Sequence, residues 1–181
     1  MIMLNGKTAS IIGTRNPTAK QRDAAQDLAY DLSAAGARIR TGAAYGIDEA
    51  AMMGALWLDV FLPWKSYNRE IIPERANITV YEPYAHATWT ASVTAWHPAP
   101  QRLSRGMFAL HARNFGIQCY PSNVDLCVAF PNSTGGGGTA QGMRIAEFLK
   151  ISLISIRAGQ DFDYDQLRDQ VFEVLGQKEA A

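Results

Sequence analysis

The sequence has few cysteines and no excess of charge of either sign. Only two cysteines occur among 181 residues, and the spacing of Cys119 and Cys127 matches no metal-binding or redox motif. Seventeen basic residues balance seventeen acidic ones, so no overall field draws the protein to a nucleic acid or a membrane surface. We therefore expect core thiols in a reducing compartment, no metal or cofactor, and anion binding only where charge is arranged locally.

Long apolar runs are also missing. No stretch approaches the ~20 apolar residues of a membrane span, and residues 1–7 lack the basic start and long apolar core of a signal peptide. Hydrophobic residues still make up 48% of the chain, which is enough to bury a full core. We expect one cytoplasmic domain over residues 1–181, with an insertion or lid at about 64–100 and a frayed tail at 177–181.

Short β-prone runs alternate with helical periodicity along the chain. The predicted strands are residues 8–12, 37–41, 58–62, 124–130 and 151–156, with a weaker candidate at 77–81. The predicted helices are residues 19–35, 47–56, 101–116, 139–149 and 163–175, with a short one near 85–95. This alternation predicts a doubly wound, mostly parallel Rossmann-like α/β sheet with helices on both faces. The looser, proline-rich and aromatic segment 64–100 is expected to lie as an irregular lid over the carboxyl ends of the strands.

A run of four glycines is the strongest functional signal. Gly135, Gly136, Gly137 and Gly138 lie between a buried strand and a helix, so the free amides and positive dipole at the helix start can meet an anion. Thr139 can add a hydroxyl donor or cap the helix. The spacing is not the dinucleotide fingerprint and lacks the lysine of a Walker-type loop. The alternative is a flexible surface loop, but its position after a central strand favours a phosphate site.

Two further turns are predicted at the same edge of the sheet. Gly13, Thr14 and Arg15 follow the first strand, and residues 42–46 follow the second. Because the carboxyl ends of parallel strands meet at one edge, we expect these loops to converge on the glycine run. Arg15 either pairs with the phosphate or forms a surface salt bridge, and we favour the phosphate.

Other polar and aromatic residues are candidates for the base or sugar of such a ligand. Asp48, at the start of the second helix, is either a helix N-terminal carboxylate, an acceptor for a ribose or a base, and Gly42 and Ala43 precede it. Arg113 and Asn114, late in a helix, face either the pocket or solvent.

The insertion adds an aromatic and basic segment. Trp64, Lys65 and Asn68 are predicted to surround the base or sugar, although the same aromatics could cover the sheet edge. Aromatic residues interleaved with basic ones are also typical of single-strand binders.

The order of these motifs resembles the DprA/Smf and LOG (SLOG) superfamily of Rossmann-like proteins. It is most similar to the short, stand-alone DprA-like proteins of bacteriophages and bacteria. The residues that carry the likeness lie between about 8 and 156: Ile11-Ile12-Gly13-Thr14-Arg15; Thr41-Gly42-Ala43-Ala44-Tyr45-Gly46-Ile47-Asp48-Glu49-Ala50-Ala51; Leu62-Pro63-Trp64-Lys65, Tyr67 and Asn68; His97-Pro98; Leu110-His111-Ala112-Arg113-Asn114; and Gly136 to Ala146.

The residues predict a protein that binds a nucleotide or nucleotide derivative by its phosphate, and the resemblance adds hydrolysis and DNA binding as alternatives. LOG enzymes split the N-glycosidic bond of nucleoside monophosphates with an arginine, matched by Arg113, and a glutamate whose position is Gly142 here. Asp48, Glu49 or Asp125 would have to replace that carboxylate, so catalysis is less expected than binding. DprA implies single-stranded DNA binding in recombination. A sensor or sponge of a signalling nucleotide would use the same pocket without turnover. Relatives commonly form dimers, so a homodimer or other homo-oligomer is a further expectation.

Overall fold

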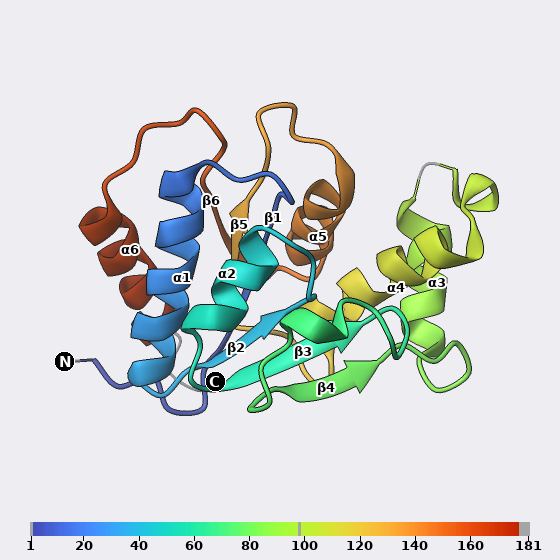
Figure 1. Cartoon of the computed structure of the whole chain (residues 1–181), viewed down its shortest axis with the longest axis horizontal. Helices are drawn as coiled ribbons and strands as arrows, with labels where there is room; N and C mark the ends of the chain where they lie inside the picture. The colour runs from blue at the N-terminus through green and yellow to red at the C-terminus, as the bar shows by residue number, and fades with distance from the viewer. Residues whose placement is uncertain (1, 98, 178–181) are drawn as a thin grey trace.

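The computed structural model describes residues 2–97 and 99–177, and it consists of one sheet between two layers of helices (Figure 1). The strands are β1 (Thr8–Gly13), β2 (Arg38–Thr41), β3 (Leu58–Leu62), β4 (Asn77–Val80), β5 (Leu126–Phe130) and β6 (Ser152–Ser155). The α-helices are α1 (Ala19–Ala34), α2 (Ile47–Gly54), α3 (Ala87–Trp96), α4 (Arg105–Cys119), α5 (Gly137–Phe148) and α6 (Tyr164–Gln177). Two short 3-10 helices, η1 (Arg69–Ile71) and η2 (Pro100–Arg102), complete the elements.

The sheet has the strand order β4-β3-β2-β1-β5-β6, and every neighbouring pair is parallel. The prediction of a doubly wound Rossmann-like α/β fold is confirmed, and the sheet is wholly rather than mostly parallel. The chain builds outward from β1 in one direction and then continues with β5 on the other side of β1. In open α/β sheets such a reversal leaves a crevice between the two central strands at their carboxyl ends.

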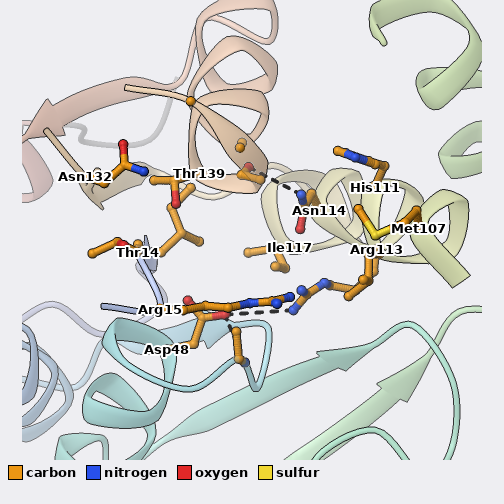
Figure 2. A pocket seen from close by; sticks show the side chains of 18 of the residues that line it. Thr14, Arg15, Asp48, Met107, His111, Arg113, Asn114, Ile117, Asn132 and Thr139 are labelled. Carbon is orange, nitrogen blue, oxygen red and sulfur yellow. Dashed lines mark hydrogen bonds and ion pairs between the residues drawn. The ribbon is translucent and has the colours of Figure 1, made fainter. Parts of the chain in front are cut away.

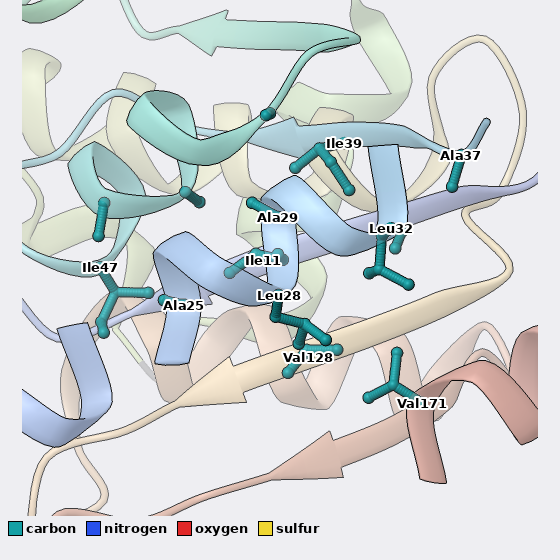
Figure 3. Close-up of a cluster of buried hydrophobic side chains, with 14 of the residues drawn as sticks. Ile11, Ala25, Leu28, Ala29, Leu32, Ala37, Ile39, Ile47, Val128 and Val171 are labelled. Atoms are coloured by element: carbon teal, nitrogen blue, oxygen red, sulfur yellow. The ribbon is translucent and has the colours of Figure 1, made fainter. Parts of the chain in front are cut away.

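Side chains alternate between the two faces of the sheet, as the pleat of a strand requires. Ile11 of β1 and Val128 of β5 pack against α1, α2 and α6, in a cluster that Figure 3 shows with Leu28, Leu32 and Val171. The residues that follow Ile11 and Val128 in their strands point to the opposite layer, formed by α3, α4 and α5. Both faces of the central strands are therefore buried, which explains why β5 is almost wholly apolar.

The segment 64–100 is more regular than expected. It contains η1, the edge strand β4 and the helix α3, and β4 extends the sheet parallel to β3. Trp89 of α3 is 1% exposed, lies 5.9 Å from the ring of Phe61 and packs against Gly116 of α4. Most of this segment is therefore a strand-helix unit of the fold. Pro98 lies outside the described residues.

Most predicted elements agree with the structure to within a few residues. The helix expected from residue 101 starts at Arg105, because residues 100–102 form η2 and the Ser104 hydroxyl accepts a hydrogen bond from the amide of Met107 at 3.2 Å. The tail expected to fray lies, apart from Gln177, outside the described residues. Among the described helices, none is both long and apolar enough to cross a membrane.

Candidate functional site

A cavity of about 450 Å³ lies at the carboxyl ends of β1 and β5. This is the crevice where the strand order reverses. The structure brings together at its walls ten residues that the sequence singled out: Gly13, Thr14, Arg15, Asp48, Arg113, Asn114, Gly136, Gly137, Gly138 and Thr139. Figure 2 shows how side chains from four separate segments face this space. The loops after β1 and β5, the start of α2 and one face of α4 thus converge as the sequence predicts.

The glycine run opens the first turn of α5 to the cavity. The N-cap Gly136 provides no side-chain hydrogen bond, and an added Cβ at Gly136 or Gly137 would meet nothing within 4 Å. Gly137 has a φ of 82°, which only glycine adopts without strain. Helix α5 therefore begins with free amides and a positive dipole end at the cavity wall, the arrangement that binds phosphate in other α/β proteins.

Gly135, the first glycine, has a different role from the one expected. Its amide donates to Asn132 Oδ1 at 2.8 Å, and Gly135 does not line the cavity. The amide is therefore used to hold the loop, while Asn132 itself lies at the cavity wall.

Arg113 reaches from α4 to the turn after β2. It is 5% exposed, its Nη1 donates to the carbonyl oxygen of Gly42, and the same nitrogen lies 3.9 Å from Asp48 Oδ2. The guanidinium also lies 5.8 Å from the centre of the Tyr67 ring. A Cβ on Gly42 would come within 1.5 Å of Nη1. Gly42 does not line the cavity. Because it has no side chain, it leaves the space that the guanidinium of Arg113 occupies.

Asp48 is buried beside this arginine. It is 5% exposed, and its Oδ2 accepts a hydrogen bond from the amide of Ala44 at 3.3 Å. Burial raises the pKa of Asp48, and the charge of Arg113 opposes that rise. Burial likewise lowers the pKa of Arg113, against the effect of Asp48. The carboxylate is thus more than a helix N-terminal group: it holds Arg113 in place.

Two cationic side chains, Arg15 and Arg113, line the cavity. Arg113 Nε is buried and has no hydrogen-bond partner among the described residues. The side chain of Arg15 is exposed, makes no hydrogen bond or ion pair within the described chain, and extends toward the guanidinium of Arg113 (Figure 2). Two like charges side by side favour an anion between or beside them.

One face of α4 forms the opposite wall. Met107, Leu110, His111, Asn114 and Ile117 recur at spacings of three and four residues and all line the cavity. Three of these side chains are apolar. Sequence reasoning identified only Asn114 here, although the helical spacing from Asn114 was a signal that could have found the others.

The aromatic segment after β3 does not reach the cavity. Of the described residues between 64 and 100, none lines it, so the structure does not bring Trp64, Lys65 or Asn68 to the cavity wall, and their contact with a base or sugar stays a prediction. Trp64 packs edge-on against Tyr67, with ring centres 5.1 Å apart. Asn68 Nδ2 donates to the carbonyl oxygen of Ala43 at 2.9 Å, which holds the turn after β2 from outside. These side chains form a second layer around the cavity wall.

Two other predicted residues, Ala43 and Glu49, do not line the cavity. Ala43 has a positive φ of 57° in the turn that presents Ala44 to Asp48, and Glu49 accepts from the amide of Gly46 at 3.3 Å.

Sequence reasoning did not identify Arg157, which follows β6. Its Nη2 lies 3.7 Å from the position that a Cβ on Gly135 would take. Its distance in sequence from the glycine run gave no signal of this proximity.

The site offers no set of ligands for a metal. The described residues contain no group of three or more histidine, cysteine, aspartate or glutamate side chains that could hold one.

Both cysteines are free, and burial raises the pKa of Cys119 to about 12 and that of Cys127 to about 11. Neither thiol is therefore ionised at neutral pH. Cys127 is the core thiol that was expected, whereas Cys119 is only half-buried.

Gly142 lies where the resembled hydrolases have a glutamate. An added Cβ would come within 2.5 Å of Ile12 Cδ1, so a side chain here requires Ile12 to move. Of the residues lining the cavity, Asp48 is the carboxylate. Asp125 lies at the opposite edge of the sheet, where its Oδ2 accepts from the amide of Thr8 at 2.8 Å.

Comparison with known proteins agrees with this architecture. Residues 1–61 match the family model of DNA recombination-mediator protein A. The structure of DNA processing protein A from Helicobacter pylori, described for its single-stranded DNA binding, aligns with a TM-score of 0.68 and 19% identity over 93% of this chain and 81% of that one. The molybdenum cofactor binding protein from Rippkaea orientalis aligns with a TM-score of 0.52 and 17% identity over 94% of this chain and 85% of that one. No curated protein sequence matches the chain.

The family match spans β1, β2 and most of β3, with the turns that carry Gly13, Arg15, Gly42 and Asp48. The structural likeness extends the same fold over nearly the whole chain. The resemblance to the DprA/SLOG proteins is thus confirmed in the sequence of residues 1–61, and the Rossmann-like fold is confirmed over nearly the whole chain. Its likeness to the short stand-alone group stays a prediction.

Proposed function

We propose that this Rossmann-like protein binds a nucleotide or nucleotide derivative in the cavity and holds it by a phosphate. The observation that carries the proposal is the convergence of two guanidinium side chains, Arg15 and Arg113, with the uncapped start of α5 at one cavity. Guanidinium groups form strong, charge-assisted hydrogen bonds to phosphate oxygens.

The charges of the cavity fit one phosphate group. Arg15 and Arg113 contribute two positive charges and Asp48 one negative charge, and α5 adds roughly half a positive charge at its start. A phosphate monoester carries about −1.5 to −2 at neutral pH, which closely matches this balance.

The rest of the wall suits the organic part of a nucleotide. Ile12, Leu110 and Ile117 give an apolar surface beside the phosphate position, and Asn114 gives a polar one. Largely apolar walls with a few fixed polar groups are typical of small-molecule sites. That surface can take a sugar and a base once the phosphate is held.

The phosphate site is tested by Gly137→Asp. An aspartate here places a negative charge at the start of α5 and should abolish the rise in melting temperature given by a pool of nucleoside monophosphates. Gly159→Asp is the matched control, because Gly159 also has a positive φ, of 85°, and open space around it but lies outside the cavity. An unchanged thermal shift in Gly137→Asp, or an equal loss in the control, refutes the site.

A second candidate function is binding of single-stranded nucleic acid. Its support is an exposed surface beside the cavity: Trp64 is 39% exposed and packs against Gly106, and Lys65, Arg69 and Arg105 are exposed cations nearby in sequence. The Helicobacter pylori protein of the same fold is described as binding single-stranded DNA. Aromatic faces next to basic side chains are the usual platform for stacked bases.

The two candidates differ in their response to salt and to ligand size. Binding of a labelled oligonucleotide that weakens steeply with salt supports the strand binder, since counterion release dominates such affinity. Mononucleotides that raise the melting temperature while oligonucleotides have no effect exclude it.

Hydrolysis of the N-glycosidic bond is a finer possibility within the first candidate. Asp48 would have to act in place of the glutamate missing at Gly142, while already paired with Arg113. Incubating concentrated protein with pooled nucleoside monophosphates and measuring free base tests it. Binding without release of base leaves a sensor or sponge of the bound nucleotide as the function.

A further inference from the structure

The orientation of one buried amide is fixed by a backbone carbonyl. Gln141 of α5 is 1% exposed, and its Nε2 donates to the carbonyl oxygen of His111 at 3.4 Å. Because a carbonyl oxygen only accepts, the nitrogen end of this amide has to face it. Gln141 Oε1 consequently faces Asn114 and the Nδ1 of His111, and accepts from both.

This arrangement also fixes the amide of Asn114. Its Nδ2 lies 2.8 Å from Gln141 Oε1 and 3.4 Å from the carbonyl oxygen of Gly138, and both atoms can only accept. The nitrogen is therefore directed at these two groups. Asn114 Oδ1 is left on the other side, where no described residue bonds to it, and Figure 2 shows it facing the space between α4 and Arg15.

The position of this free acceptor selects the part of the ligand that reaches it. Asn114 lines the same cavity as the glycines at the start of α5, so a ligand held there by its phosphate presents the adjoining group to Asn114. An oxygen acceptor needs a donor, and a phosphate dianion has none. In a nucleotide the group attached to the phosphate is the sugar, whose hydroxyls donate.

We infer that the cavity selects ribonucleotides, with Asn114 Oδ1 accepting a hydrogen bond from a sugar hydroxyl. The inference rests on the proposed function and adds the class of ligand to it. One neutral hydrogen bond in a partly buried site corresponds to about three- to tenfold in affinity. His111 supports the arrangement from Nδ1 and keeps Gln141 in place.

The test compares sugars on the intact protein. Dissociation constants are measured by calorimetry for the four ribonucleoside 5′-monophosphates and for their 2′,3′-dideoxy counterparts, and 2′-deoxy and 3′-deoxy compounds then locate the hydroxyl. We expect the ribonucleotide to bind about three- to tenfold more tightly than the dideoxy compound with the same base. Asn114→Ala should bring that ratio close to one, while Asn123→Ala, an exposed asparagine outside the cavity, should leave it unchanged.

Each outcome of the binding measurements supports or overturns the role of Asn114. Equal binding of the two series to the wild-type protein overturns the inference and leaves the phosphate site standing. A ratio that Asn114→Ala leaves unchanged also overturns it, because another group then recognises the hydroxyl. Binding of neither series overturns the proposed function and the inference together. Melting temperatures of the variants, measured without ligand, show whether each is folded.

Discussion

Replacing Gly42 by alanine tests the placement of Arg113 without touching a polar group. The new Cβ would lie 1.5 Å from Nη1 and 2.5 Å from Cζ of Arg113, and 3.0 Å from Asp48 Oδ2. The guanidinium cannot stay, and it loses both the Gly42 carbonyl and Asp48. Removing the partner of a buried charge costs about 3–5 kcal/mol, and we expect about 3 kcal/mol because the Asp48 carboxyl can take up a proton.

A double-mutant cycle separates this mechanism from a general loss of packing. Arg113→Ala alone should also cost about 3 kcal/mol, since it too leaves Asp48 buried without its partner. With Arg113 absent, the added methyl of Gly42→Ala meets little, so the double variant should be about as stable as Arg113→Ala. The coupling energy is then about 3 kcal/mol, far above the ~0.5 kcal/mol expected of independent sites.

The measurement is urea unfolding of the four proteins without ligand. Gly136→Ala serves as the control glycine, because its Cβ would meet nothing within 4 Å and its φ of −98° suits alanine. We expect that control to change stability by less than ~0.5 kcal/mol. Additive costs in the cycle, or a Gly42→Ala protein as stable as wild type, would refute the position of Arg113 against the β2 turn.

Arg15→Gln should weaken nucleoside monophosphate binding by about tenfold or more in calorimetry. The melting temperature without ligand should stay unchanged, since the Arg15 side chain has no partner in the described chain. An equal loss of binding in the exposed control variant Arg22→Gln would contradict this prediction. Burial lowers the pKa of His111, so below pH ~6.5 the unfolded chain binds more protons than the folded one. The free energy of unfolding should therefore fall as the pH drops from about 6.5 toward the lower folded pKa. Urea unfolding curves at several pH values should show a smaller fall for His111→Gln than for the wild-type protein. Gly116→Ala would place a Cβ 2.4 Å from the Trp89 ring, so denaturation should show a loss of about 1–3 kcal/mol, and an unchanged midpoint would mean that α3 does not pack there.

The sequence predicts the elements whose environment is uniform. A strand buried on both faces, such as β5, is apolar throughout, and a helix such as α1 is bounded by Thr18 and Gly36. The segment 64–100 was harder, because β4 is an edge strand whose first two residues are exposed, and α3 is apolar on more than one side. Neither pattern has a clear period, so local signals could not separate a strand-helix unit from an irregular insertion.

The sequence predicts the parts of the candidate site that the backbone of the loops forms. It predicts less well which side chains of those loops line the cavity. The glycine run and the turns after β1 and β2 converge because parallel strands place them at one edge. Trp64 and Asn68 follow β3 at the same edge, yet one packs on Tyr67 and the other bonds to Ala43, outside the cavity. Which side of a loop a side chain takes depends on tertiary contacts that spacing does not contain.

The partner of Asp48 bears on what the cavity can do chemically. A general base has to accept a proton from water or a hydroxyl, but Asp48 is buried, receives the Ala44 amide and lies 3.9 Å from Arg113. Protonating it would weaken the ion pair that holds Arg113. The second position for a carboxylate is Gly142, which has no side chain. The same contacts that fix Arg113 therefore oppose catalysis by Asp48, and within the proposed function they favour binding of a nucleotide over its hydrolysis.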